Sequence, residues 1–309
     1  MARCFVTRRL PGSALDRLSE AHEVDIWLDR LPPSPSALRE RAREVEGLLT
    51  LLTDRIDGEL LDACPSLRAI ANYAVGVDNI DLEATAARGI PVGNTPEVLT
   101  EATADLTFAL ILAAARRLPE AAAAVRAGEW LTWDPSWLLG HEVHGATLGI
   151  VGMGRIGRAV ARRARGFDMR VLHTGRGGDG VPLDELLEHA DIVSLHAPLN
   201  DSTRGMIDPA ALRRMKPTAI LVNTARGGLV DQAALREALE TGAIAAAALD
   251  VTDPEPLPPD DPLMQAPNLL ILPHIGSATH TARERMADLA VENLLAALDG
   301  QPMPHRASP

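Results

Sequence analysis

The sequence predicts an α/β protein with two doubly wound parallel-sheet domains and a cleft between them. Three observations lead to this prediction. Short apolar runs alternate with helical patterns almost throughout, which is typical of βαβ units. The 309 residues exceed what a single core usually needs. Finally, the apolar run Thr147 to Val151 leads into a glycine-rich turn and a helical pattern, Arg158 to Arg165.

The first third of the chain supplies candidate strands without a glycine-rich loop for phosphate after any of them. They are Arg3 to Thr7, Val24 to Leu28, Gly47 to Leu52, Leu67 to Tyr73 and Ile90 to Val92. An Ala- and Leu-rich helical pattern, Thr100 to Leu118, is interpreted as the crossing into a second domain. Another helical pattern, Ala278 to Leu298, is long enough to return the chain to the first. We therefore expect a discontinuous domain, 1–99 plus 279–309, and a continuous one, 100–278.

The second domain supplies six candidate strands, the number found in the dinucleotide-binding fold. They are Leu148 to Val151, Arg170 to His173, Ile192 to His196, Ala219 to Asn223, Ala245 to Asp250 and Leu269 to Leu272.

The glycine-rich turn follows the first of these strands and has the spacing Gly152, Gly154, Gly157. Gly152 allows a tight turn, Gly154 lets the backbone approach a pyrophosphate, and Gly157 permits close helix packing. The free N–H groups at the start of the next helix favour an anion. The motif therefore predicts a Rossmann-like domain that binds a dinucleotide.

Composition excludes several other classes of function. The net charge is −12 with scattered basic residues, so nucleic acid is not an expected partner. The start of the chain lacks signal-peptide features and no apolar run is long enough for a membrane span, so a soluble, cytoplasmic protein is expected. Cys4 and Cys64 stand alone, which favours buried reduced thiols. His141 and His144 are three apart rather than four, so we expect a polar loop and no metal.

Chemically distinctive residues follow three strands of the second domain. Arg226 lies after the strand ending at Asn223, Glu255 after Asp250, and His274 after Leu272. Because ligands of an open parallel sheet bind at the carboxyl ends of its strands, we expect the three side chains to meet beside the glycine-rich turn. Each residue alone is more often an ordinary loop residue, but together they indicate catalysis. The other histidines, including His173, His189, His196 and His280, are assigned structural roles.

This trio suits the reduction of a carbonyl by a nicotinamide. Hydride transfer leaves an alkoxide that needs a proton, and histidine is the side chain that exchanges protons near neutral pH. Glu255 would orient the imidazole of His274 and favour its protonated form. The planar guanidinium of Arg226 would hold a carboxylate and polarise the neighbouring carbonyl. The set implies a 2-oxo acid substrate.

On these residues the chain resembles the D-isomer-specific 2-hydroxyacid dehydrogenases, and among them most the glyoxylate/hydroxypyruvate reductases. The resemblance covers nearly the whole length. The matching segments, in order, are Asn72 to Asp81, Gly152 to Gly157, Asn223 to Gly228, Leu249 to Pro256 and Pro273 to Thr279.

The resemblance implies roles for further residues. Arg226, Glu255 and His274 are expected to be catalytic, with Arg226 and His274 also binding substrate. The N–H groups of Val75 and Gly76 are expected to bind the substrate carboxylate, because free N–H groups of a turn form an anion-binding nest. Expected along the cofactor, besides the three glycines, are Arg155, Ile156, Thr174, Arg176, Ala197, Thr224, Asp250 and Ser277.

The resemblance also implies a homodimer, with the segment around Trp130, Trp133 and Trp137 near the partner subunit. Three of the four tryptophans lie within eight positions, which fits an interface anchor and equally fits a local core cluster.

The end of the second strand indicates which dinucleotide is preferred. An NAD site usually has an acid about 20 residues past the glycines, and here Gly175 occupies that place. Thr174 and Arg176 would hydrogen-bond and neutralise a 2′-phosphate, so NADP(H) is favoured over NAD(H). Asp179 is the counter-argument, but it lies too far past the strand.

Two alternatives remain open. One is another member of the family, such as a phosphoglycerate or D-lactate dehydrogenase. The other is a dinucleotide-sensing binding protein like the corepressors built on this fold. The complete trio and the absence of basic extensions favour an enzyme.

Overall fold

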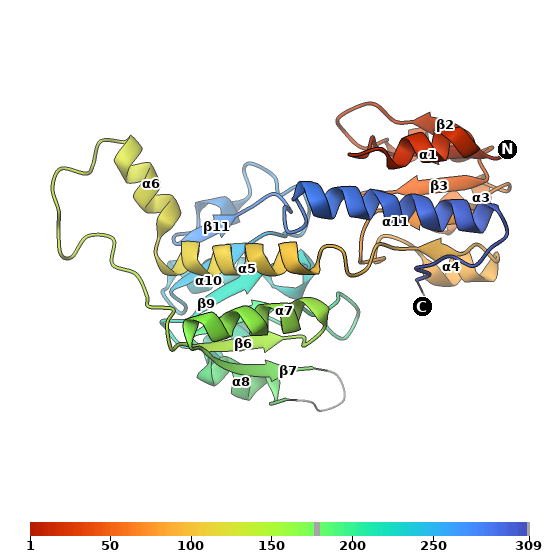
Figure 1. Ribbon diagram of the computed structural model, residues 1–309. Coiled ribbons are helices and arrows are strands. Elements are labelled where there is room, and N and C mark those ends of the chain that lie inside the picture. Colours follow the sequence, from red (N-terminus) through yellow and green to blue (C-terminus); the bar gives the residue numbers. More distant parts are fainter. Residues whose placement is uncertain (176–179, 308–309) are drawn as a thin grey trace. The chain divides into compact units, whose positions relative to one another are not determined.

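The computed structural model describes residues 1–175 and 180–307. The chain forms two compact units (Figure 1). Unit 1 comprises Met1–Leu99 and Ala278–Pro309, and unit 2 comprises Thr100–Ser277. Unit 2 is therefore inserted into the sequence of unit 1.

Unit 1 contains a five-stranded parallel sheet in the order β2-β1-β3-β4-β5. This is the flavodoxin-like doubly wound order, with its switch point between β1 and β3. The strands are β1 (Arg3–Val6), β2 (Glu23–Ile26), β3 (Gly47–Thr50), β4 (Ala69–Asn72) and β5 (Val92–Gly93). The helices are α1 (Ala14–Ala21), α2 (Pro35–Ala42), α3 (Gly58–Ala63), α4 (Leu82–Ala87) and α11 (His280–Leu298).

The elements of unit 1 follow from burial and capping. Every residue of β3 and β4 is buried, which explains why their sequences are mostly apolar. Asp57, Asp81 and Thr279 each accept a backbone N–H three residues on, and so start α3, α4 and α11. The last of these, α11, packs on α1, β3 and β4.

Unit 2 contains a six-stranded parallel sheet in the order β11-β10-β9-β8-β6-β7. The strands are β6 (Thr147–Val151), β7 (Arg170–Thr174), β8 (Ile192–Leu195), β9 (Ile220–Asn223), β10 (Ala246–Leu249) and β11 (Leu269–Ile271). The helices are α5 (Thr100–Ala115), α6 (Leu118–Arg126), α7 (Arg155–Ala164), α8 (Leu183–His189), α9 (Pro209–Arg214) and α10 (Gln232–Glu240). Short 3-10 segments are η1 (Arg165–Phe167), η3 (Gly227–Leu229) and η4 (Pro262–Gln265).

The predicted fold class, α/β with two doubly wound parallel sheets, is confirmed. The strand order of unit 2 was not predicted. Numbered within the unit it is 2-1-3-4-5-6, so β6 lies between β7 and β8. The switch point, where ligands of such sheets bind, therefore lies between β6 and β8.

The helix predicted from Thr100 to Leu118 is present, but it ends early, at Ala115. The pattern from Thr100 to Leu118 is interrupted, because α5 ends at Ala115 and Arg117 adopts a left-handed conformation with φ of 51°. In a continuous helix the ring of Pro119 would clash with the carbonyl of Ala115, four residues earlier. That carbonyl instead accepts the N–H of His141 at 2.8 Å. The helix predicted from Arg158 begins earlier, at Arg155.

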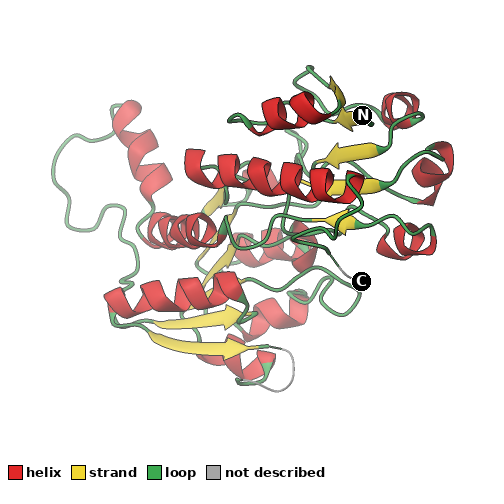
Figure 2. Ribbon diagram, turned by 45° about the vertical axis from the view of Figure 1, so that its right-hand side comes forward, coloured by secondary structure: helices red, strands yellow, loops and turns green. Residues whose placement is uncertain are grey.

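The helix α6 and the loop after it stand away from the sheet of unit 2, as Figures 1 and 2 both show. This loop carries Trp130 and Trp133, which are 64% and 80% exposed, and Trp137, which is 37% exposed. The tryptophans therefore do not form a buried cluster within the chain. Among the helices in the described residues, none combines the length and the apolar character that crossing a bilayer requires.

Candidate active site

The predicted residues of unit 2 lie along one edge of its sheet. All strand pairs in this sheet are parallel, so their carboxyl ends share an edge. The glycine-rich turn follows β6, and Ala197 follows β8 by two residues. Arg226, Glu255 and His274 follow β9, β10 and β11. The strand-end arrangement expected from the sequence is therefore present.

The three glycines of the turn differ in what surrounds them. A Cβ on Gly152 would lie 2.7 Å from the carbonyl carbon of His196, and Gly152 has φ of +99°. A Cβ on Gly157 would lie 2.2 Å from the oxygen of Gly152. Packing within the protein therefore explains why Gly152 and Gly157 are glycines. A Cβ on Gly154 meets nothing within 4 Å, so no protein contact requires a glycine there.

The position of Gly154 fits a bound phosphate. Gly154 is exposed and immediately precedes α7, whose first-turn N–H groups favour an anion. A side chain at this position would obstruct a pyrophosphate approaching those N–H groups. The turn therefore fits the dinucleotide predicted from the sequence.

His274 and Glu255 are in direct contact. The ring Nδ1 of His274 lies 2.7 Å from Oε2 of Glu255, and the two side chains are 26% and 27% exposed. The other carboxylate oxygen, Oε1, accepts the N–H of Thr252 at 3.1 Å. Glu255 is thus held by its own loop while it orients the imidazole. With Nδ1 engaged, Nε2 is the ring nitrogen left to meet a substrate.

The backbone of His274 is in the left-handed region, with φ of 55°. This conformation is unfavourable for a residue other than glycine and persists only where its surroundings impose it. Asp250 imposes it, because its carbonyl accepts the N–H of His274 at 2.9 Å. Its carboxylate oxygens accept the N–H groups of Ile275 and Gly276, each at 2.7 Å.

Asp250 itself is buried, with 1% of its surface exposed. Burial raises the pKa of the Asp250 carboxyl above its usual value, although the N–H groups of Ile275 and Gly276 oppose this rise. The family resemblance places Asp250 along the cofactor. In the structure its carboxylate fixes the loop that carries His274.

Arg226 lies in a loop that packs directly against the loop of Glu255. A Cβ on Gly227 would lie 2.0 Å from the carbonyl carbon of Thr252, so only glycine allows the two loops to approach this closely. The carbonyl of Arg226 accepts Nδ2 of Asn223 at 2.8 Å, and its Nη1 donates to the carbonyl of Ala225 at 2.8 Å. The structure therefore brings the loops of the catalytic candidates together.

The other expected cofactor residues are found in varied surroundings. Thr224 is buried and shares a 3.0 Å hydrogen bond with Thr107 of α5. Ala197 is buried and Ile156 packs against the core. Thr174 ends β7, and its carbonyl accepts the N–H of Gly152 at 2.9 Å. The remaining ones are Arg155 at the start of α7, Ser277 at the end of unit 2, and Arg176, which lies outside the described residues.

Val75 and Gly76 belong to unit 1 and follow β4. Val75 is 37% exposed. Its carbonyl accepts Nδ2 of Asn94 at 2.8 Å, and the carbonyl of Gly76 accepts Nδ2 of Asn72 at 2.9 Å. Sequence reasoning assigned no role to either asparagine. The search for polar residues at the carboxyl ends of strands, which was made for unit 2, would have indicated both asparagines. Asn72 ends β4 and Asn94 follows β5.

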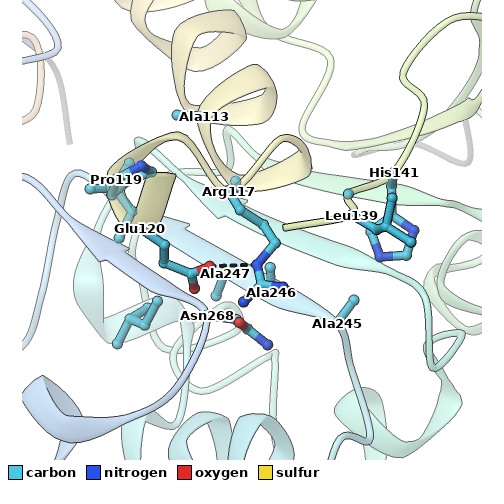
Figure 3. A pocket seen from close by; sticks show the side chains of 14 residues that line it. Ala113, Arg117, Pro119, Glu120, Leu139, His141, Ala245, Ala246, Ala247 and Asn268 are labelled. Atoms are coloured by element: carbon cyan, nitrogen blue, oxygen red, sulfur yellow. Dashed lines mark hydrogen bonds and ion pairs between the residues drawn. The ribbon is translucent and has the colours of Figure 1, made fainter. Parts of the chain in front are cut away.

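A cavity of about 260 Å³ lies elsewhere in unit 2 (Figure 3). Ala245 and Asn268, which line it, precede β10 and β11, so it opens at the amino ends of these strands. Arg117 and Glu120 form an ion pair in it. Because ligands of such sheets bind at the carboxyl ends, this cavity is separate from the catalytic candidates. Within 1–175 and 180–307, no three His, Cys, Asp or Glu residues gather in a way that could hold a metal ion.

Comparison with known proteins agrees with this geometry. Residues 108–276 match the family model of the D-isomer specific 2-hydroxyacid dehydrogenase NAD binding domain. A glyoxylate reductase of Korarchaeum cryptofilum is 52% identical over 314 residues, which cover 98% of this chain and 95% of that protein. A glyoxylate reductase of Aeropyrum pernix is 49% identical, covering 98% and 95%.

A solved structure with a similar fold is an NADPH-dependent glyoxylate/hydroxypyruvate reductase from Sinorhizobium meliloti in complex with NADP and malonate. It has a TM-score of 0.87 and 34% identity, and the match covers 99% of this chain and 96% of that one. The TT0316 protein of Thermus thermophilus has a TM-score of 0.93 and 53% identity, covering 99% of both chains. From its strand-end residues, its glycine-rich turn and these matches, the chain belongs to the D-isomer specific 2-hydroxyacid dehydrogenase family.

Proposed function

We propose that this protein is an NADPH-dependent reductase of small 2-oxo acids, which converts glyoxylate to glycolate and hydroxypyruvate to D-glycerate. The observation that carries the proposal is the 2.7 Å contact between His274 and Glu255 at the edge of the sheet where the glycine-rich turn lies. The glyoxylate reductases that are about 50% identical over nearly the full chain support the substrate class.

His274 is the proposed acid. When bound, the nicotinamide cofactor supplies the hydride that reaches the carbonyl carbon of the substrate. His274 then gives a proton from Nε2 to the carbonyl oxygen, which becomes the hydroxyl. Glu255 holds Nδ1, so the imidazole ring keeps one orientation and Nε2 is the nitrogen left for the substrate.

Arg226 and the turn at Val75 and Gly76 are the proposed carboxylate-binding groups. The guanidinium of Arg226 presents parallel donors that match a carboxylate and draws electron density from the adjacent carbonyl. The N–H groups of Val75 and Gly76 add neutral donors, as in other anion-binding nests. In this assignment residues 1–99 and 279–309 form the substrate domain, and residues 100–278 form the dinucleotide domain.

The assay is oxidation of NADPH with a panel of 2-oxo acids. Glyoxylate and hydroxypyruvate should be reduced with the highest kcat/KM, and the product from hydroxypyruvate should be the D-isomer. A greater kcat/KM with pyruvate or phosphohydroxypyruvate would instead indicate a lactate- or phosphoglycerate-type enzyme. Cofactor binding without turnover of any member would overturn the proposal and indicate a sensor.

Preference for NADPH is also proposed. The second strand of unit 2, β7, ends at Thr174 and is followed by Gly175 rather than an acid. Arg176 would add a positive charge beside a 2′-phosphate. The similar structure from Sinorhizobium meliloti, which contains NADP, supports this choice. Arg176→Ala should raise KM for NADPH far more than KM for NADH, and equal effects would contradict the assignment.

We further propose a homodimer in which the projecting loop contacts the partner subunit. Trp130 and Trp133 are large apolar side chains left exposed in the single chain, and aromatic residues are enriched at interfaces. Sedimentation should show twice the mass of the 32.9 kDa chain. Replacing Trp133 with Ser should shift the protein toward the monomer, and an unchanged monomer–dimer equilibrium would contradict the assignment of this loop.

A further inference from the structure

The turn at Val75 and Gly76 has three consecutive carbonyls held by other parts of unit 1. The carbonyl of Ala74 accepts the N–H of Thr95 at 2.9 Å. The carbonyl of Val75 accepts Nδ2 of Asn94 at 2.8 Å, and that of Gly76 accepts Nδ2 of Asn72 at 2.9 Å. The first two acceptors therefore both face the segment Asn94–Thr95.

These contacts fix where the N–H groups of the turn point. In a trans peptide, the C=O of one residue is antiparallel to the N–H of the next, and the peptides of this turn are trans. Because the carbonyls of Ala74 and Val75 face Asn94–Thr95, the N–H groups of Val75 and Gly76 face the opposite way. In the described part of the chain neither N–H donates to a protein acceptor. Two successive N–H groups on one side form an anion-binding nest.

Asn94 is itself held firmly. Its N–H donates to the carbonyl of His305 at 3.0 Å, and its carbonyl accepts Nδ2 of Asn293 at 2.9 Å. Asn293 lies in α11 and approaches so closely that a Cβ on Gly93 would lie 2.6 Å from its Cγ. The side chain of Asn94 therefore extends toward the turn from a backbone fixed on both sides.

Asn72 holds the far end of the turn from within the core. It is fully buried, and its Oδ1 accepts the hydroxyl of Thr50 at 3.1 Å. Its Nδ2 also reaches Oδ1 of Asn79 at 3.1 Å, and Asn79 in turn donates to the carbonyls of Leu51 and Asp54, each at 3.0 Å. This network leaves the amide of Asn72 a single orientation.

We propose that Asn94, with Asn72 as its buried counterpart, is a positioning residue for substrate recognition. By holding the carbonyl of Val75, Asn94 aims the N–H of Gly76 at the carboxylate of the 2-oxo acid and so sets the preference for acids over uncharged carbonyl compounds. The inference rests on the proposed function, because it assigns the substrate carboxylate to this turn.

The test compares glyoxylate with its uncharged amide, glyoxylamide, in the holoenzyme. Asn94→Ala and Asn94→Leu, whose side chain is close in size to asparagine but carries no charge, both remove the donor to Val75. Each should lower the ratio of kcat/KM for the acid to that for the amide by about tenfold, the size expected for a lost hydrogen bond to a charged group. KM for NADPH should not change. Asn94→Gln keeps an amide donor and should restore the ratio to within about threefold.

A matched control is Tyr73→Phe, adjacent to Asn72. It removes a 2.7 Å hydrogen bond from the Tyr73 hydroxyl to the carbonyl of Arg283, which is not part of the turn. The acid-to-amide ratio should stay at the parent value in this variant. A purely structural role for Asn94 would lower turnover of the acid and the amide equally.

The outcomes separate the two proposals. If the parent protein reduces no 2-oxo acid, the proposed function fails. If the parent is active and both Asn94→Ala and Asn94→Leu keep its preference for the acid, the role of Asn94 is wrong and the proposed function stands. Thermal unfolding of each variant establishes that folded proteins are compared.

Discussion

The packing of Gly227 against Thr252 gives a sharp test of how the catalytic loops are arranged. In Gly227→Ala the new Cβ would lie 2.0 Å from the carbonyl carbon of Thr252 and 2.1 Å from its oxygen, where ordinary contacts begin at 3.4 Å. Both neighbours are backbone atoms, so the loops of Arg226 and Glu255 must separate by about 1.4 Å. Displacements near 1 Å lower catalysis by on the order of 100-fold.

We therefore expect kcat for glyoxylate to fall by on the order of 100-fold in Gly227→Ala. The free energy of unfolding should fall by about 1–3 kcal/mol, as in other overpacked sites. Steady-state kinetics and urea unfolding measure the two effects. The matched control is Gly166→Ala, because a Cβ on Gly166 meets nothing within 4 Å. Near-parental kcat in folded Gly227→Ala would show that contact between these loops does not position the trio.

Three further outcomes are expected. In Gly154→Ala, where the new Cβ has open space, the melting temperature should stay unchanged while KM for NADPH rises more than about tenfold; a parental KM would remove the phosphate assignment. Glu255→Gln keeps the side-chain size but removes the charge beside His274, so kcat should fall by on the order of 100-fold with KM for NADPH unchanged. Burial lowers the pKa of His196 from 6.5 to about 4, because the charged imidazolium is disfavoured inside the fold. The contribution of His196 to the free energy of unfolding is therefore fully present above pH 6.5 and is lost as the pH falls toward 4. The free energy of unfolding measured with urea should fall by about 2 kcal/mol between pH 7 and pH 5 because of this group. The same fall in His196→Gln would show that His196 is not its cause.

The sequence pattern was sufficient for the fold class and for the loops that carry the candidate trio. Apolar runs indicate buried parallel strands. Because ligands bind at the carboxyl ends of such strands, Arg226, Glu255 and His274 could be placed along one edge of the sheet. Strand limits differ by up to two residues; for example, the run Ile90 to Val92 corresponds to β5 at Val92–Gly93. The sequence pattern does not reveal such limits, because pairing with β4 determines them.

Contacts between distant residues outside the predicted trio could not be predicted. Nothing near Gly93 in the sequence indicates that Asn293, 200 positions later, needs the space of its missing side chain. Similarly, the spacing of Asp250 and His274 does not show that one holds the other in a left-handed conformation. Both depend on three-dimensional packing that one sequence does not contain.

The insertion of unit 2 into unit 1 has a consequence for synthesis of the chain. Domains generally fold as units, beginning from the amino terminus while the ribosome is still extending the chain. Here β3 and β4 are made early, yet α11, which covers them, begins only at His280. Unit 2 is continuous and is complete by Ser277. Unit 2 can therefore finish folding before unit 1. Until α11 has been made, the apolar faces of β3 and β4 stay uncovered and need protection from aggregation.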